Sequence, residues 1–290
     1  MMIQPSSEQG TASRRVTVDG IELNYRLDGP GGDGPTLLMI HGFGASLRSW
    51  DDICPFLASG CSIIRLDLKG SGLSAKPHDG RYRAADQATL IEHFLAQLGV
   101  TDVVLVGHSL GGAIALLICF DAIERALPFR VSGLILIDSA GYPQRLPFFV
   151  RAVRFPPTRL AFDLLPARFS VWFVLSRIFS VKSRVTSARV QMYAHDLDLP
   201  GGRAALRDVA ESLSQNDGRQ LASRLPAVRV PTLLIWGRND PVIPLAHGER
   251  FNHDLASSEL VILDDTGHVP HEERPAAVAS HLSSFVRRLV

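Results

Sequence analysis

Short apolar runs bounded by glycine, proline or aspartate recur along the chain, and longer segments of helical periodicity lie between several of them. This alternation is typical of an α/β protein with a mostly parallel sheet. The clearest predicted strands are 36–40, 62–66, 103–106, 134–137, 232–236 and 260–263. They are rich in Val, Ile and Leu, as strands covered by helices on both faces are. Upstream, residues 14–18 and 21–26 flank Asp19-Gly20, which predicts a hairpin and an antiparallel edge of the sheet.

The alternation stops between about residues 142 and 225, a stretch rich in proline and aromatic residues with no convincing strand. This predicts a helical cap inserted at 142–225 into a core domain made of residues 1–141 and 226–290. Between 145 and 189, nine Lys and Arg residues accompany one acid, Asp163, a net charge of +8. The whole chain carries only +1, so its remainder must carry −7.

Composition narrows the function classes. The 290 residues are 46% apolar and 20% charged, which supports a large buried core and argues against disorder and against a dedicated nucleic-acid binder. Cys54, Cys61 and Cys119 have neither disulfide-framework nor zinc-site spacing, so a reducing, cytoplasmic location is expected. The polar N-terminal residues 1–15 lack the apolar stretch of a signal peptide, and no window is long and apolar enough to span a bilayer.

The strongest chemical signal is Gly107-His108-Ser109-Leu110-Gly111-Gly112, which follows a predicted strand and precedes an apolar helical segment. A G-x-S-x-G sequence between a strand and a helix holds its serine on a sharp turn, and the flanking glycines allow the two elements to approach closely. The hydroxyl then lies at the N-terminus of a helix, where free amides stabilise negative charge. Ser109 is therefore the candidate nucleophile.

A serine needs a base, and the base needs an orienting acid. Asp240 lies in the loop after the predicted strand 232–236, and His268 lies after the strand 260–263. Catalytic groups of open parallel sheets gather at these carboxyl ends. Asp138, which ends the strand 134–137, remains an alternative acid.

The order Ser109, Asp240, His268 is that of the α/β hydrolases, and the chain resembles this superfamily over nearly its whole length outside the insertion. His41-Gly42-Phe43-Gly44 resembles the family's oxyanion loop, and residues 67–74 resemble its D-x-x-G-x-G-x-S loop. The resemblance implies an α/β-hydrolase fold with helices on both faces of the sheet and a cap over the site. It also implies that Ser109 is the nucleophile, His268 the general base and Asp240 its partner, with the amides of Phe43 and Leu110 as oxyanion hole.

The expected activity is hydrolysis of a carboxylic ester with an apolar acyl or alcohol part, as in esterases and lipases. The serine at the elbow disfavours the haloalkane dehalogenases and epoxide hydrolases, which use a carboxylate. A carbon–carbon bond hydrolase or an acyltransferase remains open, although the related carbon–carbon hydrolases usually carry a Gly-Pro-Gly loop and a Trp where this chain has Phe43-Gly44-Ala45 and Val269. A ligand-binding receptor on a hydrolase scaffold is the alternative from another class.

Other residues near these motifs have simpler interpretations. His41 and His108 flank the site, where an imidazole most often bonds to the backbone, and His271-Glu272-Glu273 is expected to be a solvated helix start, not a metal site. The G-x-G-x-x-G spacing at Gly29, Gly31 and Gly34 is followed by a strand, so no dinucleotide site is predicted. No cofactor and no metal are expected.

The predicted cap also holds eight aromatic residues between Phe148 and Phe179. We expect this apolar stripe to line a substrate pocket, with Trp172 and Phe173 as binding residues, while the arginines extend into solvent. The same basic segment would also suit peripheral contact with a membrane surface. The expected partner is a small ester, with no nucleic acid; the oligomeric state stays open.

Overall fold

The computed structural model describes residues 12–30, 35–57 and 60–289. The N-terminal residues 1–11, on which the signal-peptide expectation mostly rests, and Gly31 and Gly34 of the G-x-G-x-x-G spacing lie outside the described residues. No helix in the described ranges is long and apolar enough to cross a membrane.

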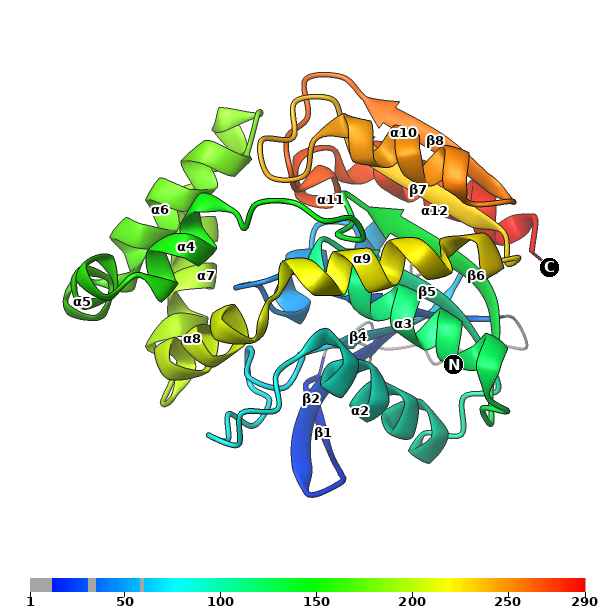
Figure 1. Cartoon of the computed structure of the whole chain (residues 1–290), viewed down its shortest axis with the longest axis horizontal. Helices are drawn as coiled ribbons and strands as arrows, with labels where there is room; N and C mark the ends of the chain where they lie inside the picture. Colours follow the sequence, from blue (N-terminus) through cyan, green and yellow to red (C-terminus); the bar gives the residue numbers. More distant parts are fainter. Residues whose placement is uncertain (1–11, 31–34, 58–59, 290) are drawn as a thin grey trace, which may run out of the picture.

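Eight strands form one sheet in the order β1-β2-β4-β3-β5-β6-β7-β8 (Figure 1). Pairs β1/β2 and β2/β4 are antiparallel, and all the others are parallel. The strands are β1 (Arg14–Val18), β2 (Ile21–Asp28), β3 (Thr36–Ile40), β4 (Ser62–Leu66), β5 (Asp102–His108), β6 (Arg130–Ile137), β7 (Thr232–Gly237) and β8 (Ser258–Leu263). The expected mostly parallel sheet with an antiparallel edge is confirmed.

Helices cover both faces of this sheet, as expected from the apolar strands. On one face α2 (Ala84–Gln97), α3 (Leu110–Glu124) and α10 (Leu245–Asp254) bury Phe94, Phe120 and Phe251. On the other face, α12 and the short elements before β4 bury Phe285 and Trp50. The elements before β4 are η1 (Leu47–Trp50) and α1 (Cys54–Leu57), whereas α11 (Pro270–Glu273) and α12 (Pro275–Arg287) follow β8.

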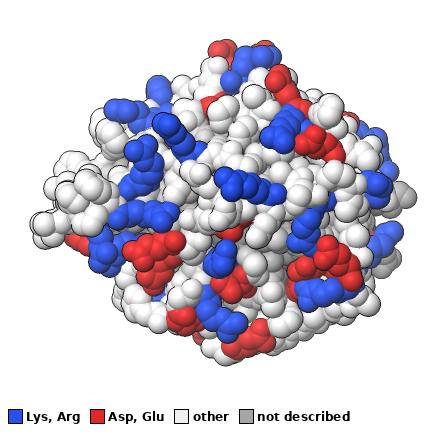
Figure 2. All heavy atoms as spheres, in the orientation of Figure 1, with Lys and Arg blue, Asp and Glu red and all other residues white. Residues whose placement is uncertain are grey.

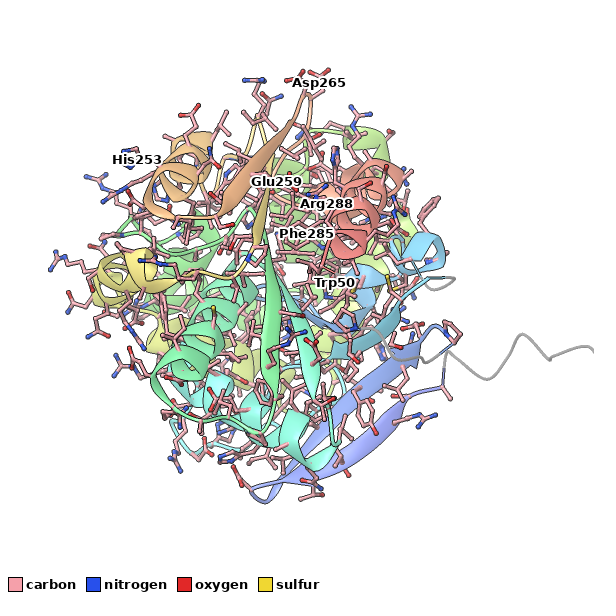
Figure 3. All side chains as sticks on the ribbon, turned by 90° about the vertical axis from the view of Figure 1, so that its right-hand side faces the viewer. Trp50, His253, Glu259, Asp265, Phe285 and Arg288 are labelled. Carbon is pink, nitrogen blue, oxygen red and sulfur yellow. The ribbon has the colours of Figure 1, made fainter. Side chains whose placement is uncertain are left out.

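The last strand differs from the expectation of a fully covered strand. Strand β8 lies at the edge of the sheet, and its residues are mostly half-buried. Glu259 on β8 forms an ion pair with Arg288, just after α12 (Figure 3). This ion pair links the edge strand to the end of α12.

Between β6 and β7 the chain forms helices and no strand, and all of this segment is described. We call residues 142–225 the insert. Its helices are α4 (Phe148–Arg154), α5 (Pro156–Leu164), α6 (Ala167–Ile178), η2 (Lys182–Arg184), α7 (Ser187–Asp198), α8 (Gly202–Ser212) and α9 (Gln215–Arg224), and η3 (Leu225–Ala227) begins at its last residue. Helices α4 to α8 form a separate lobe, whereas α9 lies along α3 and contributes Leu221 to the main core (Figure 1).

The expectation of a solvated helix start at residues 271–273 is wrong, because all three side chains are buried. The carboxylate of Glu273 accepts hydrogen bonds from the backbone amides of Gly267 and of insert residues Ser180 and Val181. Neighbouring Glu272 bonds Tyr193 and Arg189 of α7. Burial raises the pKa of Glu272 to about 7. These two acids tie the insert to the loop that carries His268.

Candidate active site

Ser109 forms the turn between β5 and α3 with φ 54° and ψ −116°. Positive φ is costly for a residue with a side chain, so neighbouring contacts must hold this turn. A Cβ at Gly107 would lie 2.4 Å from the carbonyl oxygen of Gly111, and one at Gly111 would lie 2.2 Å from that of Ile40. The two glycines are therefore required by close packing, as the sequence predicts.

The three residues proposed as a catalytic set lie within hydrogen-bond distance of one another. His268 Nε2 is 3.0 Å from Ser109 Oγ, and His268 Nδ1 is 2.8 Å from Asp240 Oδ2. The other carboxylate oxygen of Asp240 accepts bonds from the amides of Val242 and Ile243. Because an ionised carboxylate can only accept, Nδ1 carries the proton and Nε2 is left with a lone pair for the serine hydroxyl.

The backbone of His268 is held from two directions. Its amide donates to the carbonyl of Ile178, the last residue of α6, at 2.9 Å. Its carbonyl accepts from His108 Nε2 at 2.7 Å. Burial lowers the pKa of His108 well below its usual value, so His108 is a neutral donor. The backbone role expected for this imidazole is thus observed.

Asp138, the alternative acid, lies behind Asp240 and has no hydrogen bond to His268 among the described residues. Its Oδ1 accepts from the amide of Gly237 at 3.0 Å, and its buried Oδ2 has no hydrogen-bond partner in the described part of the chain. Burial, and then the nearby Asp240 charge, raise the pKa of Asp138 well above its usual value. Asp138 is therefore the neutral member of this pair of acids.

Asp138, Asp240 and His268 are also the one group in the described ranges whose donor atoms are close enough to share a metal ion. His268, however, already bonds Asp240 and Ser109 through its two nitrogens. A metal ion would have to displace one of these partners, so the arrangement favours proton transfer over metal binding.

The proposed oxyanion loop is fixed by His41. Its Nδ1 donates to the carbonyl of Gly42 at 2.8 Å, while its Nε2 accepts from the amide of Leu68 at 3.1 Å. In a trans peptide the N–H points away from the C=O, so holding the Gly42 carbonyl also directs the amide of Phe43. Neither this amide nor that of Leu110 donates to another described residue. Both remain available to a ligand beside Ser109.

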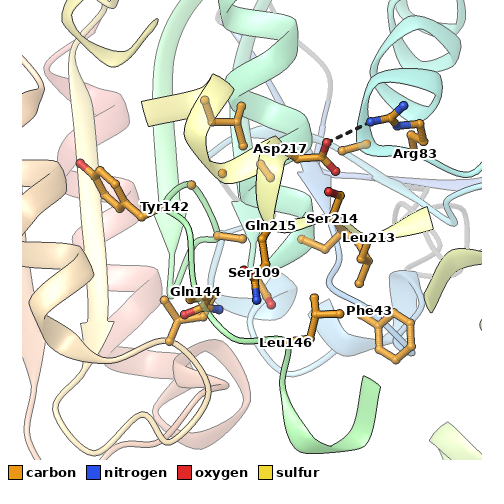
Figure 4. A pocket seen from close by; sticks show the side chains of 18 of the residues that line it. Phe43, Arg83, Ser109, Tyr142, Gln144, Leu146, Leu213, Ser214, Gln215 and Asp217 are labelled. Atoms are coloured by element: carbon orange, nitrogen blue, oxygen red, sulfur yellow. Dashed lines mark hydrogen bonds and ion pairs between the residues drawn. The ribbon is translucent and has the colours of Figure 1, made fainter. Parts of the chain in front are cut away.

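Two chambers meet at Ser109, and both are lined by Phe43 and Phe149. The first, of about 380 Å³, lies under α4 to α6 and is almost entirely apolar; we call it the apolar chamber. The second, of about 540 Å³, is still lined mostly by apolar side chains but has more polar groups than the first, including those of Gln144 and Gln215 (Figure 4); we call it the polar chamber. Nothing in the sequence predicts the polar chamber, because its polar residues come from separate loops without a motif.

The aromatic stripe of the insert divides between the chamber and the surface. Phe173 lines the apolar chamber, whereas its neighbour Trp172 does not, is 56% exposed and borders a different surface hollow. Phe155 also lies outside the chamber and is exposed. The pocket expected from this stripe therefore uses only some of its members.

Comparisons with known proteins show the family of this chain. A sequence profile described as the alpha/beta hydrolase fold matches residues 35–275. The uncharacterized hydrolase YugF of Bacillus subtilis is 30% identical over 94% of this chain and 97% of that protein. A 2-hydroxy-6-oxononadienedioate/2-hydroxy-6-oxononatrienedioate hydrolase of Klebsiella pneumoniae is 27% identical over 99% of this chain and all of its own length. The crystal structure of a membrane phospholipase A, a bacterial virulence factor, superposes with a TM-score of 0.78 at 30% identity, covering 97% of this chain and 87% of the other.

The raised pKa of Asp138 makes a prediction about stability and pH. The native protein retains a proton that the unfolded chain releases above the ordinary pKa of 3.8, so this residue makes the native state progressively less stable as pH rises towards its native pKa. Asp138→Asn removes that dependence. The free energy of unfolding of the variant should improve relative to wild type by up to about 1.4 kcal/mol per pH unit as pH rises from the ordinary pKa of 3.8 towards the native pKa of Asp138. Urea unfolding at several pH values measures this difference; a constant difference would mean that native Asp138 is ionised.

Proposed function

Because the chain belongs to the α/β-hydrolase fold family and is an enzyme of the hydrolase kind, we propose that it is a serine hydrolase that cleaves a carboxylic ester with an apolar part. The observation that carries this proposal is the hydrogen-bonded series Ser109, His268 and Asp240 at the junction of the two chambers. The free thiols Cys54, Cys61 and Cys119 are consistent with a cytoplasmic location, which stays a prediction.

In the proposed reaction, His268 Nε2 takes the proton of the Ser109 hydroxyl as Oγ bonds to the ester carbonyl carbon. Asp240 stabilises the imidazolium that forms. The ester C–O bond then breaks, and the leaving alcohol takes the proton from Nε2. Water repeats these steps on the acyl-enzyme, with His268 again as base, and releases the carboxylic acid.

The tetrahedral intermediates carry a negative charge on the former carbonyl oxygen. The amides of Phe43 and Leu110 would donate to this oxygen, and Leu110 opens α3, whose N-terminal dipole favours the same charge. His41 acts on this step indirectly, through the Gly42 carbonyl. It is a positioning residue, because its own ring nitrogens are occupied by Gly42 and Leu68.

The shapes of the chambers support a substrate with two unlike halves. The apolar chamber favours an alkyl chain, since each buried methylene contributes about 0.8 kcal/mol. The polar chamber offers amide and hydroxyl groups from Gln144, Gln215 and Ser214. An ester joining a medium-length alkyl group to a hydroxyl-bearing group would suit both.

Cleavage of a carbon–carbon bond is less well supported. The Klebsiella relative acts, by its name, on dicarboxylates, which require free cations. The arginines of the polar chamber are already paired: Arg83 with Asp217, and Arg224 with Glu124. This favours an ester substrate, and a comparison of a neutral ester with a 2-hydroxy-6-oxodienoate tests the difference.

Substitutions test the proposed catalytic residues. Ser109→Ala should lower turnover of a neutral ester by roughly 10³- to 10⁶-fold while the far-ultraviolet circular dichroism stays unchanged. Asp240→Asn should lower it by about 10²- to 10⁴-fold, because the imidazole loses its orienting acceptor.

The matched control is Asp138→Asn, the same change at a buried neighbouring acid that has no hydrogen bond to His268 among the described residues. Its turnover should stay within a few-fold of wild type, because Asp138 is already neutral. If Asp138→Asn is the more damaging change in a folded protein, Asp138 and not Asp240 serves His268.

The apolar chamber should select esters by the length of their alkyl chain. Catalytic efficiency on dissolved esters should rise about fourfold per added methylene until the apolar chamber is full. Phe173→Ala removes a wall of this chamber and should flatten or shift that series. Trp172→Ala, the neighbouring aromatic outside the chamber, should leave it unchanged. Equal effects of the two substitutions on dissolved esters would argue against the chamber as the selecting site.

Two variants test whether His41 acts by positioning the Phe43 amide. His41→Phe removes both ring bonds and should lower kcat by about 10- to 100-fold with KM within a few-fold, because the misdirected Phe43 amide is needed mainly in the transition state. His41→Asn can still donate to the Gly42 carbonyl and should recover part of kcat. A higher KM at unchanged kcat would instead assign His41 to substrate binding.

A further inference from the structure

The insert exposes an unusual amount of apolar surface. Eight of the eleven large hydrophobic side chains that are exposed in the described chain belong to residues 148–173. We call these exposed Phe, Leu and Trp side chains of α4 to α6 the apolar tip. The most exposed are Leu164 at 75% and Leu160 at 61%, both on α5. Figure 2 shows a white, uncharged projection on the left of the molecule, where Figure 1 places α5, with charged side chains beside it. Contiguous apolar surface of this kind marks an interaction site.

Lys and Arg side chains lie next to the apolar tip. Of the nine Lys and Arg residues between 145 and 189, only Arg159 and Arg189 have a carboxylate partner among the described residues. Two of the others, Arg168 and Arg177, stack on exposed rings of α6, with guanidinium-to-centroid distances of 5.1 and 4.6 Å to Phe169 and Phe173. Blue side chains lie beside the white projection in Figure 2. The tip therefore joins apolar and positively charged groups on one face.

The apolar tip is continuous with the interior. Phe148, Leu165, Phe169 and Phe173 are exposed at the surface and also line the apolar chamber. The same chamber reaches Ser109 and His268. An alkyl chain entering at the tip can therefore reach the serine along apolar side chains.

We propose that the apolar tip docks on an anionic lipid surface. Apolar side chains insert at the boundary between headgroups and acyl chains, and nearby Lys and Arg are attracted to anionic headgroups. Charge separates this occupant from a second copy of the chain. Two copies meeting at their tips would bring together the Lys and Arg side chains that have no carboxylate partner among the described residues, whereas an anionic surface neutralises these charges.

Docking would also bring an alkyl ester from the lipid surface to the mouth of the apolar chamber. This consequence rests on the proposed function; the docking itself does not. The two claims can therefore fail separately.

The docking test uses the full chain with Ser109→Ala, which binds without hydrolysing. Flotation with vesicles of phosphatidylcholine plus phosphatidylglycerol should recover the protein at low salt. Binding should weaken at high salt and with phosphatidylcholine alone, because the attraction is partly electrostatic. Leu164→Ser with Trp172→Ser, and separately Arg168→Gln with Arg177→Gln, should each weaken binding at least tenfold.

Matched controls are available elsewhere on the surface. Phe56→Ser with Ile123→Ser replaces two comparably exposed hydrophobic side chains, and Arg14→Gln with Arg287→Gln removes two cations outside the insert. Neither pair should change flotation. Equal loss in control and tip variants, or no vesicle binding, would overturn the proposal. A concentration-dependent dimer in lipid-free solution that the Leu164 and Trp172 changes abolish would overturn it in favour of a second copy.

An activity measurement separates this proposal from the proposed function. With wild-type Ser109, the Leu164→Ser and Trp172→Ser variant should hydrolyse a dissolved short-chain ester at the normal rate but an ester embedded in the anionic vesicles at least tenfold more slowly. Loss of both rates would show that the tip supports the fold and would overturn the docking role. Vesicle binding without hydrolysis of any ester would leave docking intact and contradict the proposed function.

Discussion

The strained turn at Ser109 is the constraint around which the rest of the site is built. A positive φ at a serine persists only when the surrounding packing excludes other conformations. Here the start of α3 packs so closely against β5, the end of β3 and Ser139 that Gly107, Gly111 and Gly112 have no room for a Cβ. The same closeness brings α3 against the end of β3, next to the loop of Gly42 and Phe43. One backbone constraint thus places the hydroxyl, the helix N-terminus and the oxyanion loop together.

The position of His268 depends on the insert. His268 lies on a loop whose backbone is held by Ile178 of α6 and by His108, and Glu273 bonds both that loop and the start of the next insert segment. The wall of the apolar chamber and the position of the imidazole therefore depend on the same elements. A change in the packing of α6 can alter both, which is why substitutions for testing selectivity should be made at side chains that face the chamber and not at these backbone contacts.

The sequence predicts the sheet well, and it also predicts which residues meet at the candidate site, because both depend on local patterns. Residues 36–40 and 62–66 are predicted with their observed bounds, and Ser109, Asp240 and His268 each follow a strand at the same edge. Glu272 and Glu273 are misread as solvated because their partners, Arg189 and the amides of Ser180 and Val181, are far away in the chain. Trp172 and Phe173 are adjacent aromatic residues that the sequence pattern alone does not distinguish. Only the packing of α6 against its neighbours decides that Phe173 lines the chamber.

The central claim, that Ser109 is a nucleophile activated by His268, is tested most directly by labelling with a fluorophosphonate followed by mass spectrometry. The account predicts one adduct per chain, located on the peptide that contains Ser109, formed rapidly by the wild-type protein and at least 10²-fold more slowly after His268→Ala. An adduct on a different residue, no adduct on the folded protein, or labelling that does not depend on His268 would contradict it.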